Sequence, residues 1–78
     1  MLKEKIIDLI AENLGVEKEK INLAVDFYSD LNVSKLEVAD LIVVCQKQLK
    51  ISLPPVNMEK LTTVDQLIRL FEENSDEL

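Results

Sequence analysis

The sequence predicts a small all-α bundle of three main helices and one short helix, with a long loop between the first two. Apolar residues recur at the helical period, and no stretch alternates between apolar and polar as a strand does. Two helix starts carry capping-box patterns, Ser34-x-x-Glu37 and Thr63-x-x-Gln66. A length of 78 residues accommodates one domain, so we treat residues 1–78 as a single unit.

The first helix is predicted from about Leu2 to Asn13, and Gly15 follows where a left-handed residue would end it. Its apolar residues fall on one face: Leu2, Ile6, Leu9, Ile10 and Leu14. Residues 16–33 form the long loop, which needs apolar anchors to pack on the core. Phe27 is the predicted main anchor, because an aromatic ring buries the most area.

The second helix is predicted to begin after Ser34, whose oxygen accepts from the backbone N–H of Glu37 while the glutamate accepts from the Ser34 N–H. Apolar residues between Leu36 and Leu49 cover much of its circumference. This pattern predicts that the second helix is the central and most buried one.

The last third of the sequence contains a break and two helical segments. Pro54-Pro55 stops any helix, and residues 56–61 are predicted to form one or two helical turns. The last helix opens at Thr63, and an acidic tail from Glu72 to Leu78 is predicted to fray.

Composition excludes several classes of protein. A net charge of −6 disfavours nucleic acid as a partner. The longest apolar run, Leu41 to Cys45, is too short for membrane insertion, and the first residues lack a signal-peptide pattern, so we expect a cytoplasmic protein. With no histidine and the single Cys45, we predict no intrachain disulfide, no metal site, no catalytic residues and no enzyme activity, and we interpret Cys45 as a core residue.

Four segments, in order and with matching spacing, resemble those of an acyl carrier protein. They are Phe27-Tyr28-Ser29-Asp30-Leu31, Leu36-Glu37-Val38-Ala39-Asp40-Leu41, Ile51-Ser52-Leu53-Pro54 and Glu59-Lys60-Leu61-Thr62-Thr63-Val64. The similarity covers nearly the whole chain and implies the acyl-carrier-protein-like bundle with its long first loop. The chain departs from the family in the loop, where Asn32 stands in place of a glycine.

A second departure lies where the resemblance implies attachment of the prosthetic group. The family attaches 4'-phosphopantetheine to the serine of an Asp-Ser-Leu motif, and Ser34-Lys35-Leu36 stands in that register here. Lys35 has no hydroxyl and cannot form the phosphodiester. Ser34 is either a helix cap or a displaced attachment site, so the cofactor is expected only if Ser34 is modified.

The resemblance also implies that the second helix docks partners, namely acyl-transfer or synthase-type enzymes or a dedicated transferase. Family members often present an acidic second helix, but here Lys35, Lys47 and Lys50 outnumber Glu37 and Asp40. We predict docking through Lys35, Glu37, Asp40 and Lys47, with poor binding of the usual partners. Lys35 and Asp30 could form an exposed ion pair, and we expect a monomer.

Three functional hypotheses follow. The first is an acyl-carrier-protein-like module of fatty acid, polyketide or related acyl metabolism that docks to proteins without a serine-linked arm. The second is a divergent carrier loaded at Ser34. The third is a helical module that binds lipid without covalent chemistry, in a cavity lined by four apolar residues: Leu36, Val43, Leu61 and Ile68.

Overall fold

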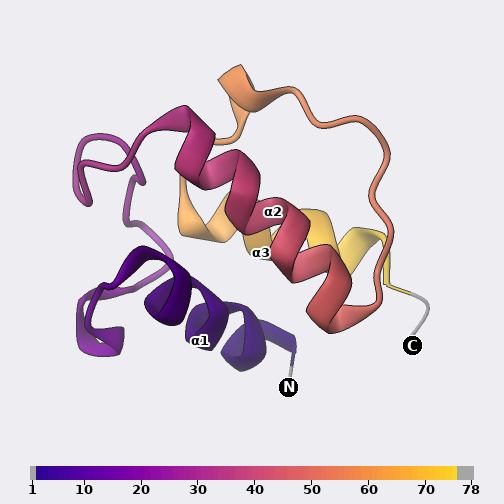
Figure 1. Cartoon of the computed structure of the whole chain (residues 1–78), viewed down its shortest axis with the longest axis horizontal. Coiled ribbons are helices and arrows are strands. Elements are labelled where there is room, and N and C mark those ends of the chain that lie inside the picture. Colours follow the sequence, from indigo (N-terminus) through magenta and orange to yellow (C-terminus); the bar gives the residue numbers. More distant parts are fainter. Residues whose placement is uncertain (1, 76–78) are drawn as a thin grey trace.

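Three α-helices and two single-turn 3₁₀ helices follow one another along residues 2–75, the part of the chain that the computed structural model describes (Figure 1). They are α1 (Leu2–Leu14), η1 (Lys18–Lys20), α2 (Lys35–Leu49), η2 (Met58–Lys60) and α3 (Val64–Glu73). Residues 2–75 contain no β-strand, only an isolated bridge between Asp26 and Thr63. The predicted all-α bundle is confirmed, and its short helix is the single turn η2.

Helix α1 ends as its sequence predicts. Gly15 has a φ of 68°, the left-handed conformation that glycine adopts without a Cβ clash. The N–H groups of Gly15 and Val16 both donate to the carbonyl oxygen of Ala11, at 3.0 and 3.2 Å. These bonds pair the Ala11 carbonyl in the last turn of the helix, and they turn the chain into the loop.

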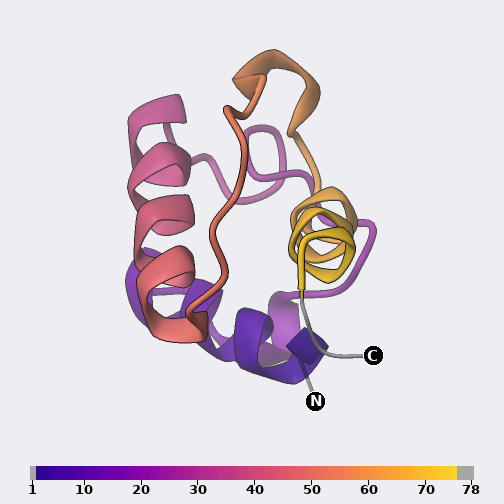
Figure 2. The same ribbon diagram turned by 90° about the vertical axis from the view of Figure 1, so that its right-hand side faces the viewer.

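The three helices enclose one apolar core. Helix α1 packs against both α2 and α3, which lie on opposite sides of the molecule with α1 across its base (Figure 2). Each helix contributes buried side chains and so does the loop between α1 and α2: Ile6, Ile10, Ile21, Val25, Phe27, Val38, Leu41, Ile42, Cys45, Leu61, Val64, Leu67, Ile68 and Phe71. Within residues 2–75, none of the helices has the length and apolar character that a membrane span requires.

The long loop before α2 is fixed to the start of α3. Phe27 is fully buried, which confirms it as an anchor, and its N–H donates to the carbonyl of Thr62 at 2.8 Å. The N–H of Val64 donates to the carbonyl of Val25 at 3.0 Å. The loop is therefore bonded to the bundle along its backbone, and the residues that lead into α2 have a defined position.

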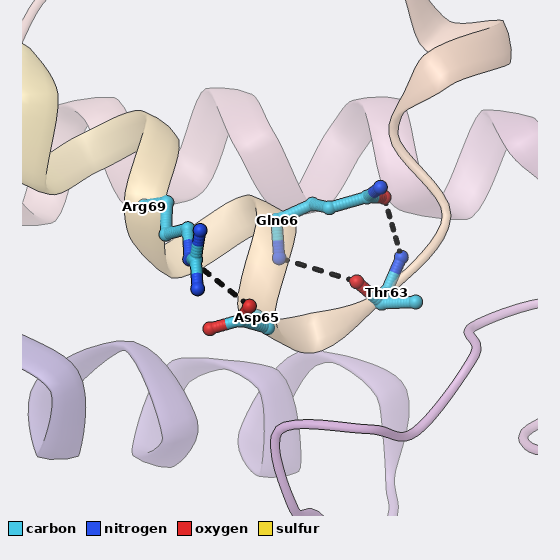
Figure 3. A network of polar contacts seen from close by, with 4 residues as sticks. All are labelled: Thr63, Asp65, Gln66 and Arg69. Atoms are coloured by element: carbon cyan, nitrogen blue, oxygen red, sulfur yellow. Dashed lines mark hydrogen bonds and ion pairs between the residues drawn. The ribbon is translucent and has the colours of Figure 1, made fainter.

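Helix α3 begins with the predicted capping box (Figure 3). The Thr63 hydroxyl accepts from the N–H of Gln66 at 3.2 Å, and the Gln66 side-chain oxygen accepts from the N–H of Thr63 at 3.1 Å. Arg69 and Asp65 form an ion pair of 3.0 Å on the same helix. The predicted acidic tail starts inside α3, since Glu72 and Glu73 belong to the helix, and residues 76–78 lie outside the described part.

The prediction that the second helix is the most buried one is wrong. Helix α2 buries one face only, through Val38, Leu41, Ile42 and Cys45. On the opposite face Leu36 is 72% exposed and Val43 is 47% exposed. The apolar composition of α2 thus exceeds what the core needs, because the helix lies at the edge of the bundle and packs on one side.

Candidate functional site

The start of α2 is the candidate functional site, and its geometry is set by Ser34 and Glu37. The exposed Ser34 is the N-cap residue, with φ −88° and ψ 163°. Its Oγ accepts from the Glu37 N–H at 3.1 Å, and the Glu37 carboxylate accepts from the Ser34 N–H at 2.9 Å. The predicted capping box is therefore confirmed, and the Ser34 hydroxyl oxygen is engaged in it.

Lys35 is the first residue of α2, and its side chain is exposed. Among residues 2–75 it makes no side-chain hydrogen bond or ion pair. The predicted pair with Asp30 is not formed, because the Asp30 carboxylate accepts instead from the backbone N–H of Asp26 at 2.8 Å. A local backbone donor satisfies Asp30 without the entropy cost of ordering a long lysine side chain.

The loop that leads into α2 is shaped by Asp26, a residue that the sequence analysis missed. Asp26 Oδ1 accepts from the N–H groups of Ser29 and Tyr28, at 2.9 and 2.8 Å. These backbone hydrogen bonds, that from Ser29 above all, lower the pKa of the Asp26 carboxyl below its usual value. The signal in the sequence was the aspartate itself, since an aspartate side chain commonly accepts from backbone N–H groups two or three residues further on.

Asn32 completes the turn with a φ of 57°. This is the left-handed region that glycine occupies freely and that asparagine tolerates better than most residues. Asn32 stands where the resemblance places a glycine, and both residue types tolerate this conformation. The N–H of Val33 then donates to the carbonyl of Phe27 at 3.2 Å and closes the loop beside the N-cap.

The exposed face of α2 carries a stripe that we call the outer stripe: Leu36, Asp40, Val43 and Lys47. These residues are spaced i, i+4, i+7 and i+11, which places them on one line along the helix. All four predicted docking residues are exposed, but only Asp40 and Lys47 lie on the outer stripe. Lys35 and Glu37 lie on its two flanks, and Glu37 is held by the capping box. The apolar members Leu36 and Val43 were not predicted as surface residues, although their spacing relative to Asp40 and Lys47 indicates it.

The four residues predicted to line a lipid cavity are not brought together in one. Leu36 and Val43 are exposed on α2, whereas Leu61 and Ile68 are buried in the core. A hollow of about 300 Å³ does lie beside α3, between the segment at Pro55 and the side chains of Arg69 and Leu70. Of the four predicted residues it includes Leu61 alone.

The structure is a helical bundle whose anchored loop presents a capped helix start at the surface, as the resemblance to a carrier domain implies. The family model described as "Phosphopantetheine attachment site" matches residues 4–71. The chain therefore belongs to the phosphopantetheine attachment site family, as an acyl-carrier-protein-like module of acyl metabolism. Acyl carrier proteins are carriers rather than enzymes, and they interact with acyl-transfer and synthase enzymes.

Two known proteins illustrate the similarity. The acyl carrier protein of Clostridium acetobutylicum is 27% identical over 77 residues, which cover 99% of this chain and 100% of that protein. The solution structure of the apo doublet acyl carrier protein from prodigiosin biosynthesis matches 95% of this chain with a TM-score of 0.81 and 18% identity. This chain spans 36% of that longer one, and the likeness shows the shared fold.

The residues at the start of α2 do not fit the prosthetic group that the family carries. A phosphodiester needs a hydroxyl at the register position, and Lys35 offers an amine. Ser34 has the one hydroxyl between residues 34 and 37, but it occupies the cap position, where the family motif has its aspartate. Aspartate and serine are equally good N-cap residues, so Ser34 does in this helix what an aspartate would do.

Proposed function

We propose that this chain is a carrier-like module of fatty acid, polyketide or related acyl metabolism that acts by docking, without a serine-linked phosphopantetheine. The observation that carries the proposal is Lys35 at the first position of α2, within a fold and loop that otherwise match a carrier. In this proposal the module has no enzyme activity, binds its partners as a monomer, and resides in the cytoplasm, where Cys45 stays reduced.

The alternative is a divergent carrier in which a dedicated transferase loads Ser34. The hydroxyl is exposed, and the cap bond uses its oxygen as an acceptor and leaves its hydrogen free. However, a shift of one position along a helix turns a side chain by about 100°. An attacking hydroxyl that is misplaced by this much loses most of the rate that positioning supplies, so loading at Ser34 would require a transferase adapted to it.

The charged residues of α2 favour partners that differ from those that bind the acidic second helix of other carriers. Asp40 and Lys47 lie on the outer stripe, and neither makes an ion pair within residues 2–75. Gln46, in a place where carriers often have an acid, accepts from the N–H of Leu53 at 2.9 Å and so fixes the segment after α2. A basic docking site built for an acidic helix would face Lys47, and we expect it to bind weakly.

Intact mass after incubation with a phosphopantetheinyl transferase and coenzyme A tests the proposal. The wild-type protein should gain no phosphopantetheine. The matched variant Ser34→Asp/Lys35→Ser restores Asp-Ser-Leu in register, and it should be loaded, because the loop and the helix start already have the carrier geometry. Wild-type protein purified from its native host with an attached arm would overturn the proposal, and Ser34→Ala would then show whether Ser34 holds it.

A further inference from the structure

The outer stripe of α2 is complementary to a second copy of itself. Leu36 and Val43 are 72% and 47% exposed, and they lie one above the other on the same line of α2; the third large apolar side chain that residues 2–75 expose, Leu23, lies elsewhere, in the loop. Asp40 and Lys47 lie two helical turns apart on the same line, with Val43 between them. Both charges lack an ion-pair partner within residues 2–75, so they remain available to a second molecule.

We propose that two copies of this chain pair through their outer stripes, with the α2 helices antiparallel. A two-fold axis between residues 43 and 44 places Asp40 of each copy opposite Lys47 of the other. The same axis brings the two Val43 side chains together at the centre, and it places Leu36 over the C-terminal end of the facing helix. Parallel helices would put Asp40 against Asp40 and Lys47 against Lys47, so the charges select the antiparallel arrangement.

The charge distribution favours this face over the others. The chain has a net charge of −6, so two copies repel at most orientations. The segment from Lys35 to Lys50 holds three lysines and two acids, and it is therefore slightly basic within an acidic protein. When two copies approach through α2, their acidic surfaces stay apart. At the ionic strength of a cell, the repulsion between charges more than about 8 Å apart is largely screened.

We expect the pairing to be weak, because each copy contributes only one face of a 15-residue helix, and stable dimers have larger interfaces. The protein is monomeric when dilute and pairs as its concentration rises. Since the dimer covers the outer stripe, self-pairing competes with any partner that docks there. The inference does not depend on the proposed function, because its test uses neither a transferase nor a docking partner.

Sedimentation equilibrium at near-physiological salt, up to about 1 mM protein, tests the pairing. Lys47→Glu should weaken self-association roughly tenfold, since two opposite-charge contacts become like-charge contacts. Asp40→Lys should weaken it as well, although this change lowers the net negative charge. The double variant Asp40→Lys/Lys47→Glu keeps the wild-type net charge and should restore association.

Lys60→Glu is the matched control, because it alters the net charge as Lys47→Glu does but lies in η2. It should associate like the wild type. A wild-type protein that stays monomeric at the highest concentration would overturn the proposal. So would tighter association of Asp40→Lys, which is what general charge repulsion predicts, or a double variant no stronger than the single ones.

Discussion

Replacement of Ser34 by alanine separates capping from attachment, because the two roles need different features of the side chain. Capping needs an oxygen that accepts from the Glu37 N–H, and this bond is 3.1 Å long in the structure. Attachment needs a hydroxyl that becomes an ester. Ser34→Ala removes both, whereas Ser34→Asp removes the hydroxyl and keeps an accepting oxygen.

The expected loss of stability in Ser34→Ala is about 1 kcal/mol, the middle of the range for N-cap substitutions. The upper end does not apply, because Ser34 and Glu37 are exposed and water can reach the freed N–H. For a domain of this length, such a loss lowers the melting temperature by roughly 4–8 °C. Urea denaturation followed by circular dichroism at 222 nm measures the change, in parallel with the melting curve.

Ser34→Asp should keep the wild-type stability within about 0.3 kcal/mol, because aspartate caps as well as serine and its charge favours a helix N-terminus. Thr63→Ala removes the corresponding cap of α3 and gives the reference cost in the same chain. A Ser34→Ala variant as stable as the wild type, or a Ser34→Asp variant as unstable as Ser34→Ala, would refute the capping argument.

Three further predictions concern the scaffold of the site. Phe27→Ala should cost about 3–5 kcal/mol in urea denaturation, since the ring is fully buried and fixes the loop, and Phe27→Leu should cost clearly less. Lys50→Gly should stabilise the protein by about 0.5–1 kcal/mol in the same assay, because Lys50 ends α2 with a φ of 57°. Burial raises the pKa of the Cys45 thiol to about 12, so iodoacetamide should modify it only as fast as the protein opens. The unfolded thiol loses its proton first, so its contribution to stability should fall as pH rises above about 9 and towards 12. The pKa values of Tyr28 and Lys18 are also raised and add to the loss, so Cys45→Ala should show a smaller loss than the wild type.

The features that the sequence predicts well are local ones. Both capping boxes can be read from residues three positions apart, and Gly15 marks the end of α1 within one residue of the prediction. The burial of Phe27 follows from the size of the ring in a loop that must pack on something. These features depend on chemistry within one turn of the chain or on one strongly apolar side chain, and tertiary structure does not override them.

The features that the sequence predicts poorly depend on where the helices lie. Periodicity gives the apolar residues of α2 but not how many of them a neighbour covers, so Leu36 and Val43 were assigned to the interior. The absence of the pair between Lys35 and Asp30 depends on a competing backbone donor at Asp26, whose position is fixed only once the loop has folded. Both errors concern the site, because the site is formed by exposed residues next to the core.

The different demands of docking and attachment explain why we assign a docking role. Docking needs the outer stripe and the helix start held in place, and the loop does this through Phe27 and its bonds to the start of α3. Attachment needs a single hydroxyl oxygen at the first position of α2, where the side chain is exposed and contributes nothing to the core. Exchange of that oxygen for the Lys35 amine leaves the cap, the loop and the stripe unchanged. A carrier fold can therefore lose its arm without losing the surface that partners contact. An intact cap at Ser34 beside a lysine at position 35 is the arrangement that we expect after such a loss.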